Sequence, residues 1–295
     1  MTVSSVKYRG NQGSNIANTN RGPSPNIWSQ IPIGNILDGS NDGWGHRDDF
    51  LIAYDGSPTS VANIGFYEMF AESGGSFLGG VTKYGIQGLV AGTTADADVI
   101  MTLGGGAPFE INTSGVGKLV FEARIKISSI ADNIGSFFIG LAEEDRAAAA
   151  GLLTATQGTT ADSALADIDM LGFWHPDTDA ALLHVAYGKA GQTAVKLIDS
   201  FHTMVADTWF KVGFVFDLNQ GYDGTILKTP RIKFYLNGVE SSTVLDSSST
   251  AATGIAATDF PAGEEMTMVC GIVNDDATND HTLSVDWWQC FQLEL

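Results

Sequence analysis

Apolar and polar residues alternate along much of the chain from about residue 44 onward, and this pattern predicts β-strands. The clearest case is the run KLVFEARIKIS at residues 118–128. A period of two is typical of a strand with one face in the core and the other in water. The predicted core side is Leu119, Phe121, Ala123, Ile125 and Ile127, and the predicted wet side is Val120, Glu122, Arg124 and Lys126.

Similar runs follow at short, regular spacing. Asn237 and Gly238 separate two β-rich runs, and this dipeptide suits a type I′ hairpin turn, which needs positive φ at both positions. A helix is expected only in the Ala-rich stretch 142–153. About a dozen strands predict an all-β protein, a two-sheet antiparallel jelly-roll sandwich, as one domain over residues 44–295. The other expected strands are 136–142, 170–175, 181–188, 194–199, 209–217, 231–245, 266–273 and 281–295.

Residues 1–43 have a different composition, rich in Asn, Gly, Ser and Pro and without either period. A disordered leader is one interpretation. The segment nevertheless contains more apolar side chains than a solvated linker should. We therefore expect an extended arm that becomes ordered on a neighbouring protein, anchored by Ile27, Trp28, Ile31, Ile33, Ile36 and Leu37.

The net charge of the chain limits the classes of partner that it is expected to bind. The chain of 295 residues has 15 Lys and Arg against 34 Asp and Glu, a net charge of −19, which disfavours nucleic acid and anionic membranes. Residues 1–40 hold three basic residues and one acid, a net +2, so the remainder carries −21. No apolar run reaches the roughly 18 residues of a membrane helix. The opening MTVSSVKYRG lacks the layout of a secretory signal, so we expect synthesis in a cytosol.

The last predicted strand contains two adjacent tryptophans, which must face opposite ways. Strict alternation places Trp287 with Leu283 and Val285 on one face and Trp288 with Cys290 on the other. Trp288 is therefore the candidate to contact a partner subunit or a sugar. If residues 273 and 282 pair across the loop, Cys270 lies opposite residue 285, so both cysteines are expected to be free thiols.

Several of these segments resemble the concanavalin A-like and laminin-G-like jelly rolls, and more narrowly the versions that tailed bacteriophages carry as virion structural proteins. The resemblance covers about residues 65–295, and IWSQIPIGNILDGSNDGWGHRDDF is similar to the leader of the phage versions. The segments that carry it are GGSFLGGVTKYGIQGLV, KLVFEARIKISSI, SFFIGLAEED, GFWH, WFKVGFVFD, IKFYLNGVE and HTLSVDWWQCFQLEL.

This resemblance implies a capsid decoration, or cement, protein on the outer surface of a phage head in the virion, made in the host cytoplasm. Its partners would be the major capsid protein and neighbouring copies of itself, as a dimer or trimer. The arm would supply the contacts, with Arg9 and Arg21 pairing with capsid carboxylates. The apolar anchors named above would be buried against the capsid.

The alternative is a carbohydrate-binding, lectin-like module of a phage fibre or tail, with a host-surface glycan as its ligand. Lectins of this superfamily hold Ca²⁺ with loop carboxylates, and Ca²⁺ takes six to eight oxygens. A weak candidate is the loop with Asp275, Asp276 and Asp280 beside Asn274, Asn279 and His281; Asp42, Asp48 and Asp49 form a second. Neither has EF-hand spacing, and an ordinary acidic turn explains the loop as well.

We expect that the chain is not an enzyme and that it has no catalytic residue and no cofactor. Glycoside hydrolases of this fold carry an E-x-D-x-x-E motif, and Asp167 and Asp169 match only its first two acids. The sequence has no G-x-S-x-G, and the glycines at 104–106 lack the Lys of a phosphate loop. We expect His175 at a sheet edge and His184 as a core histidine.

Overall fold

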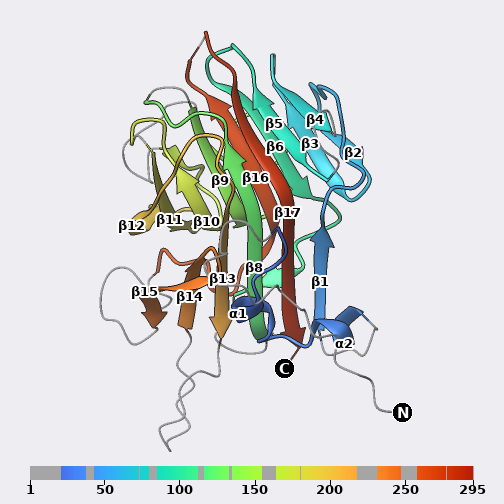
Figure 1. Cartoon of the computed structure of the whole chain (residues 1–295), viewed down its shortest axis with the longest axis vertical. Coiled ribbons are helices and arrows are strands. Elements are labelled where there is room, and N and C mark those ends of the chain that lie inside the picture. The colour runs from blue at the N-terminus through green and yellow to red at the C-terminus, as the bar shows by residue number, and fades with distance from the viewer. Residues whose placement is uncertain are drawn as a thin grey trace, which may run out of the picture.

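Two antiparallel sheets pack face to face in the computed structural model (Figure 1). The eight-stranded sheet runs in the order β15 (Val239–Asp246), β14 (Arg231–Leu236), β13 (Phe210–Asp217), β8 (Val116–Ile127), β17 (His281–Glu294), β5 (Gln87–Ala91) and β4 (Ser76–Gly79), with β1 (Gly43–Asp48) also on β17. The nine-stranded sheet runs β12 (Val195–Thr203), β11 (Leu182–Gly188), β10 (Met170–His175), β9 (Gly135–Ala142), β16 (Glu265–Asn274), β6 (Ala97–Leu103), β3 (Tyr67–Ala71) and β2 (Ala62–Ile64), with β7 (Phe109–Glu110) also on β16.

The structure describes residues 21–37, 43–72, 74–79, 85–111, 116–132, 135–154, 164–179, 181–217, 231–246, 258–276 and 278–294. The helices within these ranges are α1 (Pro25–Trp28) and α2 (Ile33–Leu37). Neither is long enough to cross a bilayer. The predicted all-β, two-sheet antiparallel sandwich is confirmed by the strand pairing.

The core between the sheets is aromatic. Phe121 of β8 stacks on Phe214 of β13 with ring centroids 5.3 Å apart, and Phe173 of β10 lies against Phe214 from the opposite sheet. All five residues predicted for the core side of β8 are fully buried. The predicted hairpin is also confirmed: Asn237 and Gly238 have φ of 53° and 76° between β14 and β15.

The outer side of each sheet is covered by a segment outside the strands. Residues 21–37 lie on the eight-stranded sheet, where their apolar side chains pack on Val120, Val215, Tyr235 and Phe291. On the nine-stranded sheet, Leu152, Leu165 and Ile168 pack on outward-facing residues of the strands. The parts of the two outer faces beneath these segments are therefore shielded from solvent.

These covers overturn the expected wet face of β8. Val120 and Glu122 are 0% exposed and Arg124 is 9% exposed. The alternation itself is correct, but a segment almost 100 residues earlier in the chain covers the polar side. The described part of the arm, residues 21–37, is not extended throughout, because it contains the short helices α1 and α2.

The expected helix at 142–153 is absent from this stretch, all of which the structure describes. β9 continues to Ala142, and the residues after it form turns, with positive φ at Asp145 and Ala150. The amide of Ala150 donates a hydrogen bond to Asp98 of β6 at 2.6 Å. Packing of this segment on the sheet therefore overrides the helix propensity of alanine.

The two last strands also differ from expectation. β16 and β17 lie in different sheets and do not pair as a hairpin. Asp286 is an extra residue in β17, since Val285 pairs with Ile125 and Trp287 with Arg124. This bulge reverses the alternation, so Trp288 is a fully buried core residue and Trp287 faces outward. Cys270 and Cys290 are free thiols, as predicted, and the structure shows that both are buried.

Candidate functional site

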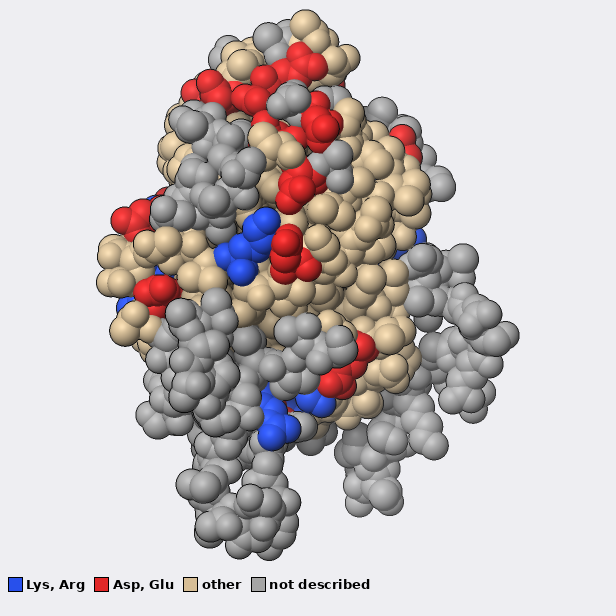
Figure 2. All heavy atoms as spheres, turned by 90° about the vertical axis from the view of Figure 1, so that its left-hand side faces the viewer, with Lys and Arg blue, Asp and Glu red and all other residues tan. Residues whose placement is uncertain are grey.

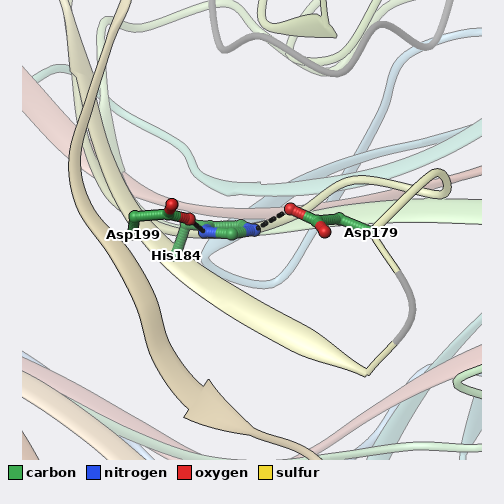
Figure 3. Close-up of side chains that lie close together, drawn as sticks. All are labelled: Asp179, His184 and Asp199. Atoms are coloured by element: carbon green, nitrogen blue, oxygen red, sulfur yellow. Dashed lines mark ion pairs between the residues drawn. The ribbon is translucent and has the colours of Figure 1, made fainter.

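Asp179, His184 and Asp199 form a polar cluster on the nine-stranded sheet (Figure 3). Asp179 belongs to the turn between β10 and β11, His184 to β11 and Asp199 to β12. Among the described residues, this is the group of histidine, cysteine and acidic side chains that could meet around an ion, with its atoms within 4.8 Å of one another.

Strand geometry brings these residues together. His184 lies opposite Trp174 of β10 on the outer side of the sheet, and the two rings are 5.6 Å apart. On its other side, Leu183 pairs with His202 and Val185 with Ile198, so three residues of β12 face His184 alone. This bulge includes Ser200 at φ 53° and turns Asp199 toward the imidazole. Non-glycine residues with positive φ are uncommon and cluster at functional sites.

The two carboxylates flank opposite sides of the imidazole. Nε2 of His184 lies 2.9 Å from Oδ2 of Asp179, and Nδ1 lies 3.0 Å from Oδ1 of Asp199. The amide of Ser200 donates a hydrogen bond to Nδ1 at 3.1 Å. The imidazole side chain is fully buried, whereas the carboxylate side chains are 36% and 71% exposed.

The charges around the imidazole are mixed. Burial lowers the pKa of His184, and the ammonium of Lys196 lowers it further against the pull of the two carboxylates. Burial alone would raise the pKa of Asp199, but Lys196 brings it below its usual value. The neutral imidazole thus accepts from Ser200, and Nζ of Lys196 lies 3.4 Å from Asp199 and 3.7 Å from Asp179.

The cluster does not fit a single metal ion as it is arranged. Nδ1 already faces the Ser200 amide, which leaves Nε2 as the nitrogen that could bind a cation. Asp199 lies on the Nδ1 side, away from that position. We therefore assign no metal here, and the arrangement instead offers carboxylate acceptors and an ammonium donor to a ligand. The face that carries β11 and β12 shows scattered acidic side chains and few basic ones (Figure 2).

The predicted calcium loop is held together by its own hydrogen bonds. Asp276 accepts from the amide and hydroxyl of Thr278 and from the side-chain amide of Asn279. The side-chain amide of Asn274 donates to the carbonyls of Asp276 and Asn279. Asp280 makes none of the contacts described for this loop. This is the ordinary acidic turn that the sequence left open.

Asp275 points away from that loop toward Asp177. Burial raises the pKa of Asp177 to about 7, and a hydrogen bond with the Asp275 carboxyl adds to the shift. In the second calcium candidate, the carboxylate of Asp48 is occupied within the chain, because it accepts hydrogen bonds from the Tyr67 hydroxyl and the Phe50 amide. Asp42 lies outside the described residues.

Asp167 and Asp169, the partial hydrolase motif, bind a turn. They accept hydrogen bonds from the amides of Gly191 and Ala190 in the β11–β12 turn. Asp169 also shares a hydrogen bond with Glu143. The carboxyls of Asp169 and Glu143 are therefore closer together than the roughly 5–5.5 Å that separates the two catalytic carboxyls of a retaining glycosidase.

The residues expected to bind a capsid are occupied within the chain where the structure describes them. Arg21 pairs with Asp286 at 2.6 Å, and Ile27, Trp28, Ile31, Ile33 and Ile36 are at most 8% exposed against the eight-stranded sheet. Arg9 and the side chain of Leu37 lie outside the described residues. The anchors would have to leave this sheet before they could bind a partner.

Two further expectations are corrected. Trp288, the candidate for a sugar or partner, donates from Nε1 to the Tyr67 hydroxyl inside the core. His175 is not at an edge, because β10 lies between β9 and β11, and its Nδ1 contacts the Leu182 carbonyl at 2.8 Å. His184 is buried, as predicted.

Comparisons with known proteins give structures of similar shape. No protein-family model and no curated protein matches the chain. An endo-1,3-beta-glucanase from Streptomyces sioyaensis is 14% identical, with 85% of this chain and 96% of that one covered and a TM-score of 0.49. Lectin II from Ulex europaeus is 13% identical, with 85% and 99% covered and a TM-score of 0.47. A protein of unknown function from Shewanella oneidensis MR-1 is 14% identical, with 88% and 92% covered and a TM-score of 0.45. These likenesses carry no argument about function.

Sequence reasoning misses Asp179, Asp199 and Lys196. In the sequence, Asp199 marks the end of a strand, because the bulge after it breaks the alternation that would continue to Thr203. No spacing in the sequence links residue 179 to residue 199. The cluster exists only because β12 pairs with β11 out of register at that point.

Proposed function

We propose that this chain is a carbohydrate-binding protein without catalytic activity, and that the Asp179–His184–Asp199 cluster with Lys196 holds the ligand. The observation that carries this proposal is the fixed set of partly exposed acceptors and one donor around a buried imidazole on paired strands. A carboxylate accepts hydrogen bonds from two neighbouring hydroxyls of a sugar, and charged acceptors make the stronger bonds. His184, Lys196 and Asp199 lie on paired strands, and rigid elements hold such groups more precisely than loops do.

Binding suits the described carboxyl pairs better than hydrolysis does. Asp169 and Glu143 are in direct contact, as are Asp177 and Asp275, which leaves no room between them for a glycosidic bond. Asp179 and Asp199 are separated by the imidazole ring. We therefore propose a binding site in which the carboxylates orient hydroxyls.

The capsid role expected from the sequence has less support. Its anchors in residues 21–37 are buried on the chain's own sheet, whereas the carboxylates of the cluster face solvent. We accordingly prefer the lectin-like role to capsid decoration.

The test is a glycan screen of the full chain, followed by calorimetric titration with the best ligand. Asp179→Asn with Asp199→Asn should weaken binding by at least about tenfold, since a hydrogen bond to a charged group contributes about 1.5–3 kcal/mol. Asp145→Asn is the matched control, because Asp145 is exposed outside the cluster. Equal binding by the double variant, or no glycan bound by the wild type, would refute the proposal.

A further inference from the structure

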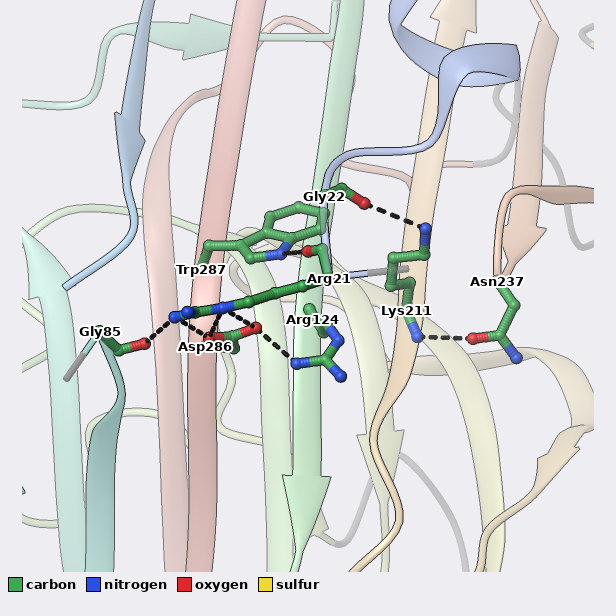
Figure 4. Close-up of polar contacts among 8 residues, drawn as sticks. All are labelled: Arg21, Gly22, Gly85, Arg124, Lys211, Asn237, Asp286 and Trp287. Atoms are coloured by element: carbon green, nitrogen blue, oxygen red, sulfur yellow. Dashed lines mark hydrogen bonds and ion pairs between the residues drawn. The ribbon is translucent and has the colours of Figure 1, made fainter. Parts of the chain in front are cut away.

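Residues 21–37 cover part of the outer side of the eight-stranded sheet, over β8, β13, β14 and β17, and the surface beneath them is called here the outer groove. Its polar end holds Arg21 (Figure 4). Nε of Arg21 donates to Asp286 at 2.8 Å, and Nη2 donates to the Gly85 carbonyl at 3.0 Å. Arg124 approaches the same carboxylate at 2.5 Å, and the indole of Trp287 donates to the Arg21 carbonyl.

The rest of the groove is apolar with a buried carboxylate. Trp28 packs edge-on against Phe291 with centroids 5.8 Å apart, and its Nε1 donates to Glu122 at 2.5 Å. The amide of Ser24 donates to the same Glu122 oxygen at 3.0 Å, and Lys211 reaches the Gly22 carbonyl at 3.2 Å. An apolar centre with Trp and Arg anchors is the usual composition of a protein–protein interface.

The floor of this groove is composed like a solvated sheet face. Glu122 and Gln289 are paired neighbours on β8 and β17, and Lys211 is 3% exposed. Beneath the segment, Oε1 of Glu122 and both side-chain polar atoms of Gln289 are buried without a hydrogen-bond partner. Each such group loses hydration when the segment docks and gains no hydrogen-bond partner in return. Docking is consequently weaker than its apolar area implies.

Within the described residues, the segment adds no strand to the sheet and is held by side chains and by capping of polar groups. It carries one charge, that of Arg21, so the remainder of the chain has a net charge of −20. Every copy of the chain presents both this segment and the acidic body with its groove. The same contacts can therefore form between two copies.

We propose that the outer groove is a recognition site for residues 21–37 of a second copy, so that two chains pair by exchanging these segments. Such exchange of an identical element is a low-cost route to dimers. A tethered segment has an effective concentration of about millimolar, so exchange in the wild type competes only near that chain concentration.

The decisive experiment removes the competing contact within each chain. One full-length chain carries Arg21→Glu, and a second carries Arg124→Glu with Asp286→Lys, which inverts the buried ion pair. Within each variant alone, like charges meet at the groove. In the mixture, the carboxylate introduced in the first chain's segment matches the inverted groove of the second chain. The unchanged Arg21 of the second chain likewise matches the unchanged Asp286 of the first.

We expect each variant alone to be monomeric by native mass spectrometry and the mixture to form a one-to-one heterodimer, with at least about tenfold more dimer than either alone. Adding Trp28→Ala to both chains should abolish the heterodimer, whereas Phe66→Ala, a change of an exposed aromatic on the β2–β3 turn, should not. A heterodimer that survives Trp28→Ala would place the contact elsewhere and overturn the proposal.

Wild-type chains with two different tags give an independent readout if the inverted pair fails to fold. Co-purification of the tags after incubation near millimolar concentration supports exchange, and its loss with Trp28→Ala assigns the segment. Folded variants that stay monomeric when mixed, or wild-type chains that never form mixed pairs, refute the proposal.

Discussion

At the scale of single residues, Asp98 is a carboxyl group held at an energetic cost. It lies on β6 under the turn that covers the sheet, is 4% exposed, and leaves Oδ1 without a hydrogen-bond partner. Burial raises the pKa of Asp98 to about 7, and the carboxylates of Glu72 and Asp96 raise it further against the Ala150 hydrogen bond. The folded protein therefore binds a proton that the unfolded chain releases at lower pH.

Asp98→Asn should remove this pH dependence. A pKa raised on folding contributes stability that is present below the unfolded value of about 3.9 and is lost as pH rises through about 7. The variant should match the wild type near pH 4 and exceed it above pH 8 by up to roughly 4 kcal/mol. Calorimetric melting from pH 4 to 9 measures the difference, in which the histidine contributions common to both proteins cancel. A constant difference across this range would contradict the assignment.

Residue-level features explain where the sequence predicts well. The alternation at 119–127 identifies the core side of β8 in full, and Asn237–Gly238 identifies the β14–β15 hairpin, because both depend on local geometry. Trp288 is predicted on the wrong face because one extra residue, Asp286, reverses the alternation. The partners of His184 are not predicted, because they arrive through strand register.

At the scale of elements, residues 21–37 pack over the titratable carboxyl group of Glu122 on β8. Burial raises the pKa of Glu122, against the effect of the hydrogen bonds from Ser24 and Trp28 and the charge of Lys211. Arg124, Asp286 and Arg21 are the other charged groups at this contact. The docked segment therefore favours the protonated carboxyl, and docking weakens as pH rises.

Glu122→Gln should make docking independent of pH. Amide hydrogen exchange in residues 21–37, corrected for intrinsic rates, should quicken between pH 5 and 8 in the wild type. The variant should keep constant protection, because an amide carries no charge to bury. Lys233→Gln, which removes a partly exposed charge paired with Glu240, serves as the control and should behave as the wild type. Unchanged wild-type protection across this range would exclude the mechanism.

Segments whose structure depends on contacts with residues far away in the sequence cannot be predicted from a local sequence pattern. The Ala-rich stretch 142–153 has helix propensity, yet its turns follow the outer side of β6 and bury Leu152. The apolar residues of the arm identify it as a segment that binds something, but they do not identify its position, because no local pattern reveals that Glu122 lies beneath Trp28. Strands with a repeating pattern are predictable, and the segments that cover them are not.

At the scale of the whole molecule, charge opposes compactness. A net charge of −19 on one sandwich generates self-repulsion that salt screens. The Debye length falls from about 30 Å at 0.01 M to about 8 Å at 0.15 M. The long-range repulsion should therefore decrease more than the buried ion pair of Arg124 and Asp286, whose carboxylate is 1% exposed.

We expect the melting temperature at pH 7.5 to rise by a few degrees between these two salt concentrations, equivalent to roughly 1 kcal/mol. Calorimetry in sodium chloride measures this, with sucrose at matched osmolality as the control. A fall in melting temperature would mean that surface ion pairs outweigh net repulsion.

The contact between Trp28 and Glu122 also constrains how this sequence can change over evolutionary time. The two residues are 94 positions apart, yet the indole donates to the carboxylate with water excluded from both. Loss of either side chain leaves the other buried without its hydrogen-bond partner, whereas a matched change of both residues does not. Positions 28 and 122 should accordingly co-vary among descendants of this chain, with a substitution at one accompanied by a substitution at the other.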